Sequence, residues 1–207
     1  MPTIEENKIL VGKYPWLISP DKMTGKIPDD YDYSKTVLDA MPTGWRIAFG
    51  DLLCEDIQKE LEKFDYADKF VVVQLKQKMG DMRLYHNGVP TGCNVGKIIE
   101  AYSVLSQYIC IDCGELDVPQ THGWVEPICK ECVKSYRVKD PEKYWNDLYE
   151  EQKPCTLPEE YSYRVWNMDA DDWEVVTVDV SDKVKRIRKK YYERKQIEDK
   201  QKSGKRV

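Results

Sequence analysis

Histidine is scarce in this chain, and long apolar runs are missing. Only His86 and His122 occur among 207 residues, although general acid–base sites use histidine more often than any other side chain. The chain has no Gly-x-Ser-x-Gly elbow, no phosphate-binding glycine loop and no His-Glu-x-x-His motif. No apolar run is long enough to cross a bilayer, and the first residues lack the basic start and apolar core of a secretion signal. We therefore expect a soluble, cytoplasmic protein that carries no familiar catalytic motif.

The charge is unevenly distributed along the sequence. The whole chain has a formal net charge of −5, whereas residues 183–207 contain twelve Lys or Arg and three Asp or Glu, a local charge of +9. The preceding 182 residues therefore carry −14. A solvated basic helix explains this segment most simply, and contact with nucleic acid or an acidic partner is the alternative.

Four cysteines form the strongest motif. Cys110 and Cys113 make one Cys-x-x-Cys pair, Cys129 and Cys132 make a second, and fifteen residues separate the pairs. This spacing is typical of tetrahedral Zn²⁺ sites. Gly114 follows the first pair and can take the positive φ that such a turn often needs. Because four sulfurs fill the coordination shell, the spacing predicts a structural zinc ribbon over residues 110–132.

The remaining cysteines and the histidines are weaker candidates. Cys54, Cys93 and Cys155 are expected to be thiols, because an odd remainder argues against a disulfide framework. His122 lies inside the predicted ribbon and is an alternative ligand. His86 is expected at the surface, where a strand ends. Cys93 is a candidate nucleophile only if a base lies nearby.

Three regions follow from the local patterns. Residues 1–42 are rich in proline and aromatic residues and predict an ordered arm without a long helix, anchored by Trp16. Residues 43–155 predict a helix capped by Thr43, a hairpin, a second helix and the ribbon. Residues 156–207 predict a further hairpin and a basic helix that frays beyond Lys195. The expected fold class is α+β, a mostly antiparallel sheet flanked by helices, with the four-cysteine zinc ribbon integrated into it.

Two basic groups are candidate binding surfaces. The first lies on the predicted hairpin of the central region and the second on the C-terminal helix. A solvated surface is the commoner interpretation of both, and binding is the alternative. The residues are Lys76, Lys78, Arg83 and Tyr85 in the first group, and Lys185, Arg186, Arg188 and Lys189 in the second. The loop 167–172 also contains three aspartates that suit a hard cation, but it lacks the spacing of an EF-hand.

A string of motifs resembles a known group of proteins. The string comprises Tyr14-Pro-Trp-Leu, Tyr31-Asp-Tyr, Met41-Pro-x-Gly-Trp-Arg-x-Ala-Phe-Gly, Gln74-x-Lys-x-Lys-x-Gly-x-x-Arg-x-Tyr and the ribbon. In this order the motifs resemble an uncharacterised family encoded by bacteriophages, prophages and gut bacteria, over about residues 10 to 135. The resemblance implies a phage or mobile-element accessory protein made in a bacterial cytoplasm. The family has no established activity, so the resemblance implies no catalytic residue.

Three functions are compatible with these observations. The leading hypothesis is a non-enzymatic binding protein with structural zinc, whose acidic body binds a host protein. In its sharper form, the body inhibits a defence or nucleic-acid enzyme by occupying its basic groove. The second is a direct nucleic-acid binder that uses the two basic groups and Lys130. The third is a metal-dependent enzyme with acidic ligands.

Overall fold

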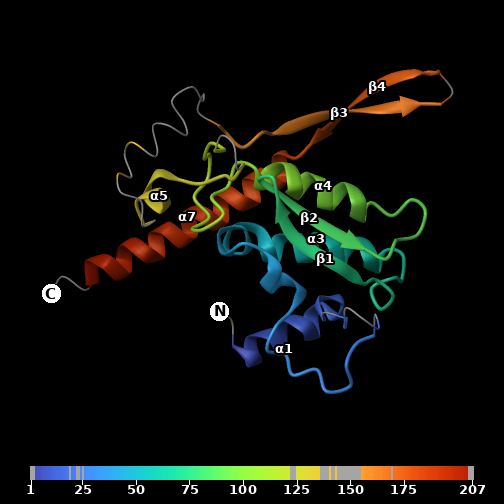
Figure 1. Cartoon of the computed structure of the whole chain (residues 1–207), viewed down its shortest axis with the longest axis horizontal. Coiled ribbons are helices and arrows are strands. Elements are labelled where there is room, and N and C mark those ends of the chain that lie inside the picture. The colour runs from blue at the N-terminus through green and yellow to red at the C-terminus, as the bar shows by residue number, and fades with distance from the viewer. Residues whose placement is uncertain are drawn as a thin grey trace.

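The computed structural model combines helices with two separate antiparallel hairpins, which is the predicted α+β class (Figure 1). It describes residues 3–18, 20–21, 24, 26–121, 125–135, 140, 143, 155–168 and 170–204. The pair Asp140-Pro141 is typical of a helix start, and the helix that it predicts falls almost wholly outside these residues. In the described part of the chain, no helix combines the length and the apolar character needed to span a membrane.

The N-terminal region contains a helix that the proline content did not predict. Helix α1 (Ile4–Lys13) begins at a capping box in which Glu6 N–H donates to the Thr3 hydroxyl and the Glu6 carboxylate accepts from Thr3 N–H. The short 3₁₀ turn η1 (Pro15–Leu17) follows and buries Trp16, as expected of the anchor. The expectation of an arm without a long helix was wrong, because all the prolines of the region lie outside residues 4–13.

The first central helix is divided by a π-helical turn. After the 3₁₀ turn η2 (Val37–Ala40), the chain forms α2 (Thr43–Trp45), the π-helical turn η3 (Arg46–Gly50) and α3 (Asp51–Glu62). Large apolar side chains of this segment are buried, including Phe49, Ile57 and Leu61. The prediction of Thr43 as N-cap was wrong by one residue: Pro42 holds that position, and no side chain caps the helix.

The β1–β2 hairpin packs against the second central helix. Strands β1 (Val72–Lys78) and β2 (Asp81–His86) pair antiparallel through a tight turn at Met79 and Gly80, both with positive φ. Met82 and Leu84 are buried toward α4 (Val95–Ser106), while Arg83 and Tyr85 are exposed, so the side chains of β2 alternate between the two faces of the hairpin.

The C-terminal part adds a projecting hairpin and a long helix. After the short helix α5 (Lys130–Ser135), strands β3 (Glu160–Asn167) and β4 (Asp172–Asp179) form an arm that extends from the body (Figure 1). Helix α7 (Ser181–Gly204) follows at once. The prediction that this helix frays beyond Lys195 was wrong, since it continues to Gly204.

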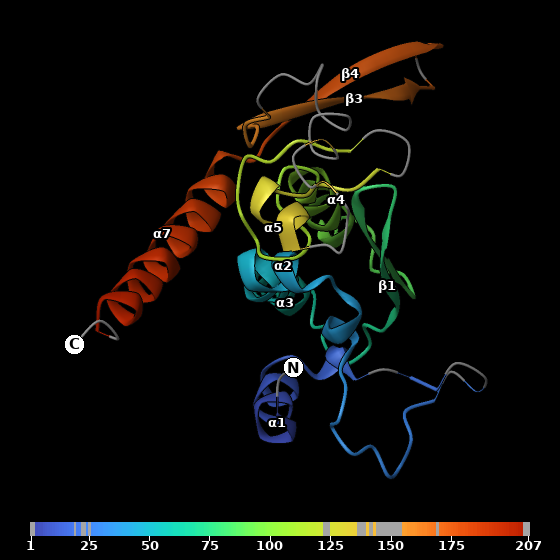
Figure 2. The same ribbon diagram turned by 60° about the vertical axis from the view of Figure 1, so that its left-hand side comes forward.

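The elements are arranged in layers around one core. Figure 2 shows the β1–β2 hairpin and α7 on opposite sides of α3 and α4, with α1 below them and the arm above. The main apolar cluster takes residues from all three predicted regions, from Val11 to Ile187. The four cysteines of the predicted ribbon lie beside this core in a smaller cluster with Val118, Ile128 and Val133.

Candidate metal centre

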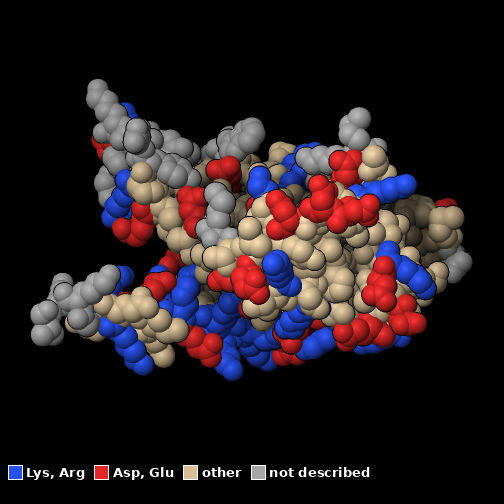
Figure 3. All heavy atoms as spheres, turned by 90° about the horizontal axis from the view of Figure 1, so that it is seen from below, with Lys and Arg blue, Asp and Glu red and all other residues tan. Residues whose placement is uncertain are grey.

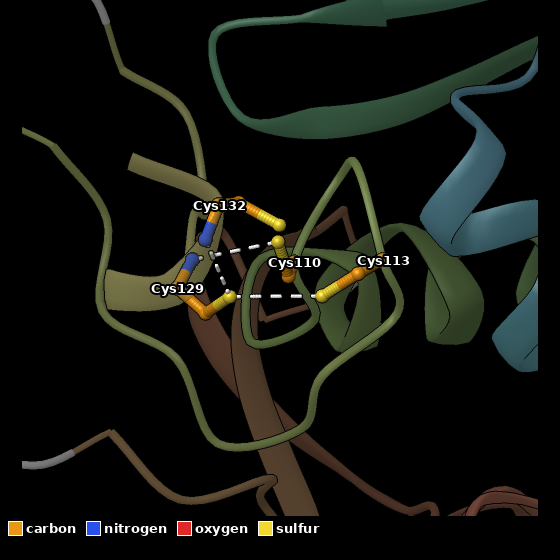
Figure 4. Close-up of side chains that lie close together, drawn as sticks. All are labelled: Cys110, Cys113, Cys129 and Cys132. Atoms are coloured by element: carbon orange, nitrogen blue, oxygen red, sulfur yellow. Dashed lines mark hydrogen bonds between the residues drawn. The ribbon is translucent and has the colours of Figure 1, made fainter. Parts of the chain in front are cut away.

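The four predicted ligands come from two short turns that face each other. Cys110 and Cys113 lie in the loop after α4, Cys129 immediately precedes α5, and Cys132 lies within α5. Their ligand atoms all lie within 4.8 Å of one another. In Figure 4 the four sulfur atoms point toward a common centre. The structure thus brings together every cysteine that the spacing selected.

The sulfur separation suits a tetrahedral ion. The Sγ atoms of Cys113 and Cys129 are 3.6 Å apart. A tetrahedron with metal–sulfur distances of about 2.3 Å places its sulfurs roughly 3.8 Å apart. Cys110 and Cys129 are buried, and the other two cysteines are partly exposed. The four thiols could therefore hold one metal ion near the surface, with two ligands anchored in the interior.

Backbone N–H groups near the cysteines point to the sulfur atoms and would stabilise negative charge there. Cys129 N–H points to the sulfur of Cys110 and Cys132 N–H to the sulfur of Cys129, each at 3.4 Å. Gly114 has φ +72°, the positive value predicted for the first turn. The second turn needs no glycine because it continues into α5, where Val133 N–H donates to the Cys129 carbonyl at 3.1 Å.

The thiols influence one another's protonation. Hydrogen bonds from Cys113 and Cys129 lower the pKa of Cys110. The neighbouring Cys110 sulfur raises the pKa of both Cys113 and Cys129. Burial is the largest cause that raises the pKa of Cys132 to about 12. Binding a metal ion would require every ligand thiol that is protonated to release its proton.

The first cysteine turn rests directly on the start of α2. Gly44 N–H donates to the Ile111 carbonyl at 2.7 Å, and the Trp45 indole donates to the Ile109 carbonyl at 2.8 Å. A Cβ atom on Gly44 would lie 2.0 Å from the Cys110 carbonyl oxygen and 2.6 Å from the Gly114 nitrogen. Only a glycine permits this approach. The loop of residues 110–117, called the metal loop below, therefore shares a backbone contact with the helical core.

Helix α7 holds the same loop from the other side. The Arg188 guanidinium binds both carboxylate oxygens of Asp117 at 2.9 and 3.0 Å. Glu115 accepts a hydrogen bond from Tyr191 and pairs with Lys195 at 2.9 Å. The pKa of Arg188 is raised, chiefly by its hydrogen bonds with Asp117. The loop 114–117 is therefore fixed by the metal turn on one side and by α7 on the other.

The first predicted binding surface forms the open face of the β1–β2 hairpin. Lys76 lies opposite Arg83 and its ammonium lies 5.3 Å from the centre of the Tyr85 ring. Lys78 is exposed beside them, opposite Asp81. Arg83 forms an ion pair with Asp81, which reduces the positive charge of the face.

The second predicted surface is divided between the interior and the solvent. Arg186 pairs with Asp56 and Glu55 of α3, and Arg188 pairs with Asp117 as described. Lys185 and Lys189 are exposed. Figure 3 shows the Lys and Arg side chains that gather along one edge of the molecule, running from its C-terminal end, with acidic residues among them. Two of the four predicted residues therefore attach α7 to the acidic body.

The weaker candidates are dispersed. Cys54 is buried, as predicted, and burial raises the pKa of its thiol to about 12. His86 is half-buried, its Nδ1 accepts from Gly88 N–H, and burial lowers its pKa. Asp169 of the acidic loop and His122 lie outside the described residues. Within the described residues, the cysteines are the one group of three or more His, Cys, Asp or Glu arranged to hold a metal.

Sequence reasoning did not identify Gly44, Glu115 and Asp117 as supports of the centre. Gly44 occurs in the run Pro-Thr-Gly-Trp, and a glycine within a helical pattern can have a packing reason. The two carboxylates carry no such signal, because their partners on α7 are more than seventy residues away.

Comparison of this chain with protein-family models, with curated proteins and with solved structures found no match in any of the three. The resemblance to phage-encoded proteins stays a prediction from the motifs.

Proposed function

We propose that this chain is a non-enzymatic binding protein whose fold is maintained by one structural Zn²⁺ ion. The observation that supports this proposal most directly is the convergence of four cysteine sulfurs on one point. Zinc is the commonest ion for such an all-sulfur, tetrahedral shell. A shell of four thiolates leaves no position for substrate or water, so the ion stabilises the loop and performs no chemistry.

The architecture around the centre fits a stabilising ion. The metal loop contacts the backbone of α2 through Gly44 and the side chains of α7 through Glu115 and Asp117. Holding this loop in one conformation therefore positions two helices that are distant in sequence. A structural ion can supply on the order of 10 kcal/mol to the folding of a small module.

A protein is the target that the charge distribution favours. The body is acidic, and the cations Lys183, Arg186 and Lys190 of α7 pair with carboxylates of α3. This neutralisation weakens the case for phosphate binding by α7. The motif resemblance suggests a phage or mobile element in a bacterial cytoplasm, where the target would be a host protein, such as a defence or nucleic-acid enzyme.

Direct nucleic-acid binding is the second candidate, and the cluster of Lys76, Lys78 and Tyr85 on the open face of β1–β2 favours it. It predicts that affinity for DNA or RNA falls steeply as salt is added, since released counterions drive such binding. Absent or salt-insensitive binding to both would exclude it.

Metal analysis of the purified chain tests the structural ion. We expect about one zinc per chain, retained after dialysis, and a marked loss of zinc in Cys129→Ser. Cys93→Ser is the matched control, because Cys93 lies outside the cluster and should leave the zinc content unchanged. A chain that folds normally and contains no zinc would contradict the proposal.

Affinity capture from bacterial cells tests the binding role. The full chain serves as bait, and both proteins and nucleic acids in the eluate are identified. We expect one protein to be enriched specifically and to stay bound after nuclease treatment. Enrichment of nucleic acid alone would support the second candidate.

A further inference from the structure

The β3–β4 arm has two chemically different faces. In the antiparallel register Tyr161 lies opposite Val178 and Tyr163 opposite Val176, and these side chains are half-buried. Tyr161 and Val178 pack against the main core. The other face carries Arg164 with its partner Val175 and, toward the tip, the pair of Trp166 and Trp173. This outer face is exposed. The arm is therefore attached at its base and free on its outer side.

The outer face ends in a patch of large apolar side chains. Trp166 and Trp173 pair across the strands, with their ring centres 5.4 Å apart and their planes near perpendicular. They are 45% and 58% exposed, Val175 on the same face is 60% exposed, and Met168 in the turn is 84% exposed. A contiguous exposed patch of this kind marks an interaction site more often than an ordinary surface.

Hairpin stability explains only part of this patch. A cross-strand aromatic pair stabilises an isolated two-stranded hairpin, which is otherwise marginal in water. That role accounts for the two tryptophans facing each other. It does not account for the exposure of Met168 and Val175, which extends the apolar surface beyond the pair.

Charge restricts what can cover the patch. Residues 159–179 contain seven Asp or Glu and one Arg, a formal net charge of −6. This charge repels nucleic-acid phosphates, anionic membranes and the arm of a second copy. The α7 helix of a second copy is a poor complement too, because much of its positive charge pairs with its own body. A cationic protein surface remains the best electrostatic match.

We propose that the outer face of the β3–β4 arm docks on a Lys- and Arg-lined surface of another protein. Trp166, Trp173 and Val175 enter an apolar pocket there, and the carboxylates of the arm lie against the surrounding cations. Tryptophan is among the residues that contribute most to protein interfaces, and rim charges guide association. This inference rests on the proposed function of binding a protein and names the contacting surface and its partner's chemistry.

Site-specific photo-crosslinking tests which face is used. A photoreactive benzoylphenylalanine replaces Val175 in the full, metal-loaded chain, and the matched control carries it at Glu193, which is exposed on α7. The probes are an alternating Arg–Leu peptide, a Glu–Leu peptide of equal length, a DNA duplex and vesicles of anionic phospholipid. We expect crosslinking to the Arg–Leu peptide at position 175, and about tenfold less at position 193 or with any other probe.

Several outcomes would overturn the inference. These are equal labelling at both positions, preference for DNA or vesicles, crosslinks between two copies of the chain, or a crosslink to residues 144–154 of the same chain. The last would mean that the chain covers its own patch.

A change in the charge of the arm separates this inference from the proposed function. Glu160→Lys with Asp179→Asn changes two exposed carboxylates that pair with each other on the outer face of the arm, and the Asn can still accept from Ser181 N–H. Glu193→Lys is the control. Exciton-coupled circular dichroism of the tryptophan pair verifies that the hairpin is retained. We expect the double variant to lose about tenfold in affinity for the Arg–Leu peptide and for the protein captured by the full chain, while the control loses nothing. Capture of no protein would refute the proposed function, whereas capture that the double variant retains would refute only the role of the arm.

Discussion

At the scale of single residues, Gly44 links the metal loop to the helical core. Its N–H donates to Ile111, and the carbonyl of Cys110 occupies the space that a side chain would need. The opposing Gly114 is equally constrained, because its own Cβ would lie 2.7 Å from the Gly44 carbonyl. The two glycines therefore allow two backbone segments to touch where any larger residue would separate them.

Gly44→Ala should destabilise the protein strongly. The added Cβ meets backbone atoms, which cannot move as a flexible side chain can, so we expect a loss of about 3 kcal/mol or more in the free energy of unfolding. Gly96→Ala is the matched control, since Gly96 also occupies the second position of a helix and a Cβ there meets nothing within 4 Å. It should stabilise by up to about 1 kcal/mol. Denaturant unfolding of both variants is the measurement, and equal effects would contradict the packing argument.

At the scale of elements, α7 packs across the body and is attached to both α3 and the metal loop. Val184 and Ile187 bury its apolar side, and ion pairs on either side of them reach α3 and the metal loop. The strong separation of charge along the sequence thus has a structural use, because the basic helix neutralises the acidic surface that it covers.

Arg188→Gln should weaken the attachment of α7 to the body more than Lys189→Gln. Arg188 makes a two-point ion pair with Asp117 in which both side chains are about 30% exposed, whereas Lys189 is exposed. We expect losses of about 1–2 kcal/mol and less than about 0.5 kcal/mol, respectively. Thermal unfolding checks the difference, and hydrogen exchange in α7 should rise only in the first variant. Equal melting temperatures would show that α7 is held on the body by apolar packing alone.

Glu60 connects α3 to α4 and should give stability a dependence on acid. Its side chain, 6% exposed, accepts hydrogen bonds from Lys63 and from the backbone N–H of Asn94 at the start of α4, and these bonds lower its pKa. A carboxylate with a lowered pKa stabilises the fold above its unfolded pKa, and this contribution is lost as the pH falls through the folded value.

Glu60→Gln should therefore lower stability at neutral pH by about 1–2 kcal/mol. The difference from the natural chain should shrink below pH 4.5, the ordinary pKa of glutamate. Urea unfolding over a series of pH values is the measurement. Glu62→Gln, on the exposed side of α3, is the control. A difference independent of pH would mean that the charge of Glu60 contributes little.

At the scale of the whole molecule, the four-cysteine cluster is joined to several elements of the body. Its loop contacts α2 through backbone atoms and α7 through ion pairs, and the arm continues directly into α7. Any change at the four cysteines should consequently reach elements that bear no ligand.

Removal of the metal should loosen the body as well as the loop. A chelator is expected to lower the melting temperature and to increase hydrogen exchange in α2, α7 and residues 110–118, because these segments share contacts. Exchange within the paired strands of the arm should change little, since the arm is held by its own ladder. Increased exchange confined to the metal loop would show that the centre is an independent module. Readdition of zinc should restore protection.

The sequence alone was sufficient to select the four cysteines that cluster and to predict both hairpins and helices α3, α4 and α7. Cysteine spacing is a local property, and the helical and alternating patterns of α3, α4, β1 and β2 express which face each element buries. Two errors concern local signals. The prolines of residues 1–42 argued against a helix, although Thr3 and Glu6 form a capping box that starts α1. The charged end of α7 is helical although it has no apolar stripe.

Only the tertiary structure decided how these elements use their neighbours. The contact of Gly44 with Cys110, the ion pair of Arg188 with Asp117 and the exposed side of Trp166 all join or separate residues far apart in the chain. Such relations depend on which surfaces meet after folding, and no pattern within one segment contains that information. The four cysteines could be selected from their spacing alone, whereas the residues that support them could be recognised only in the folded chain.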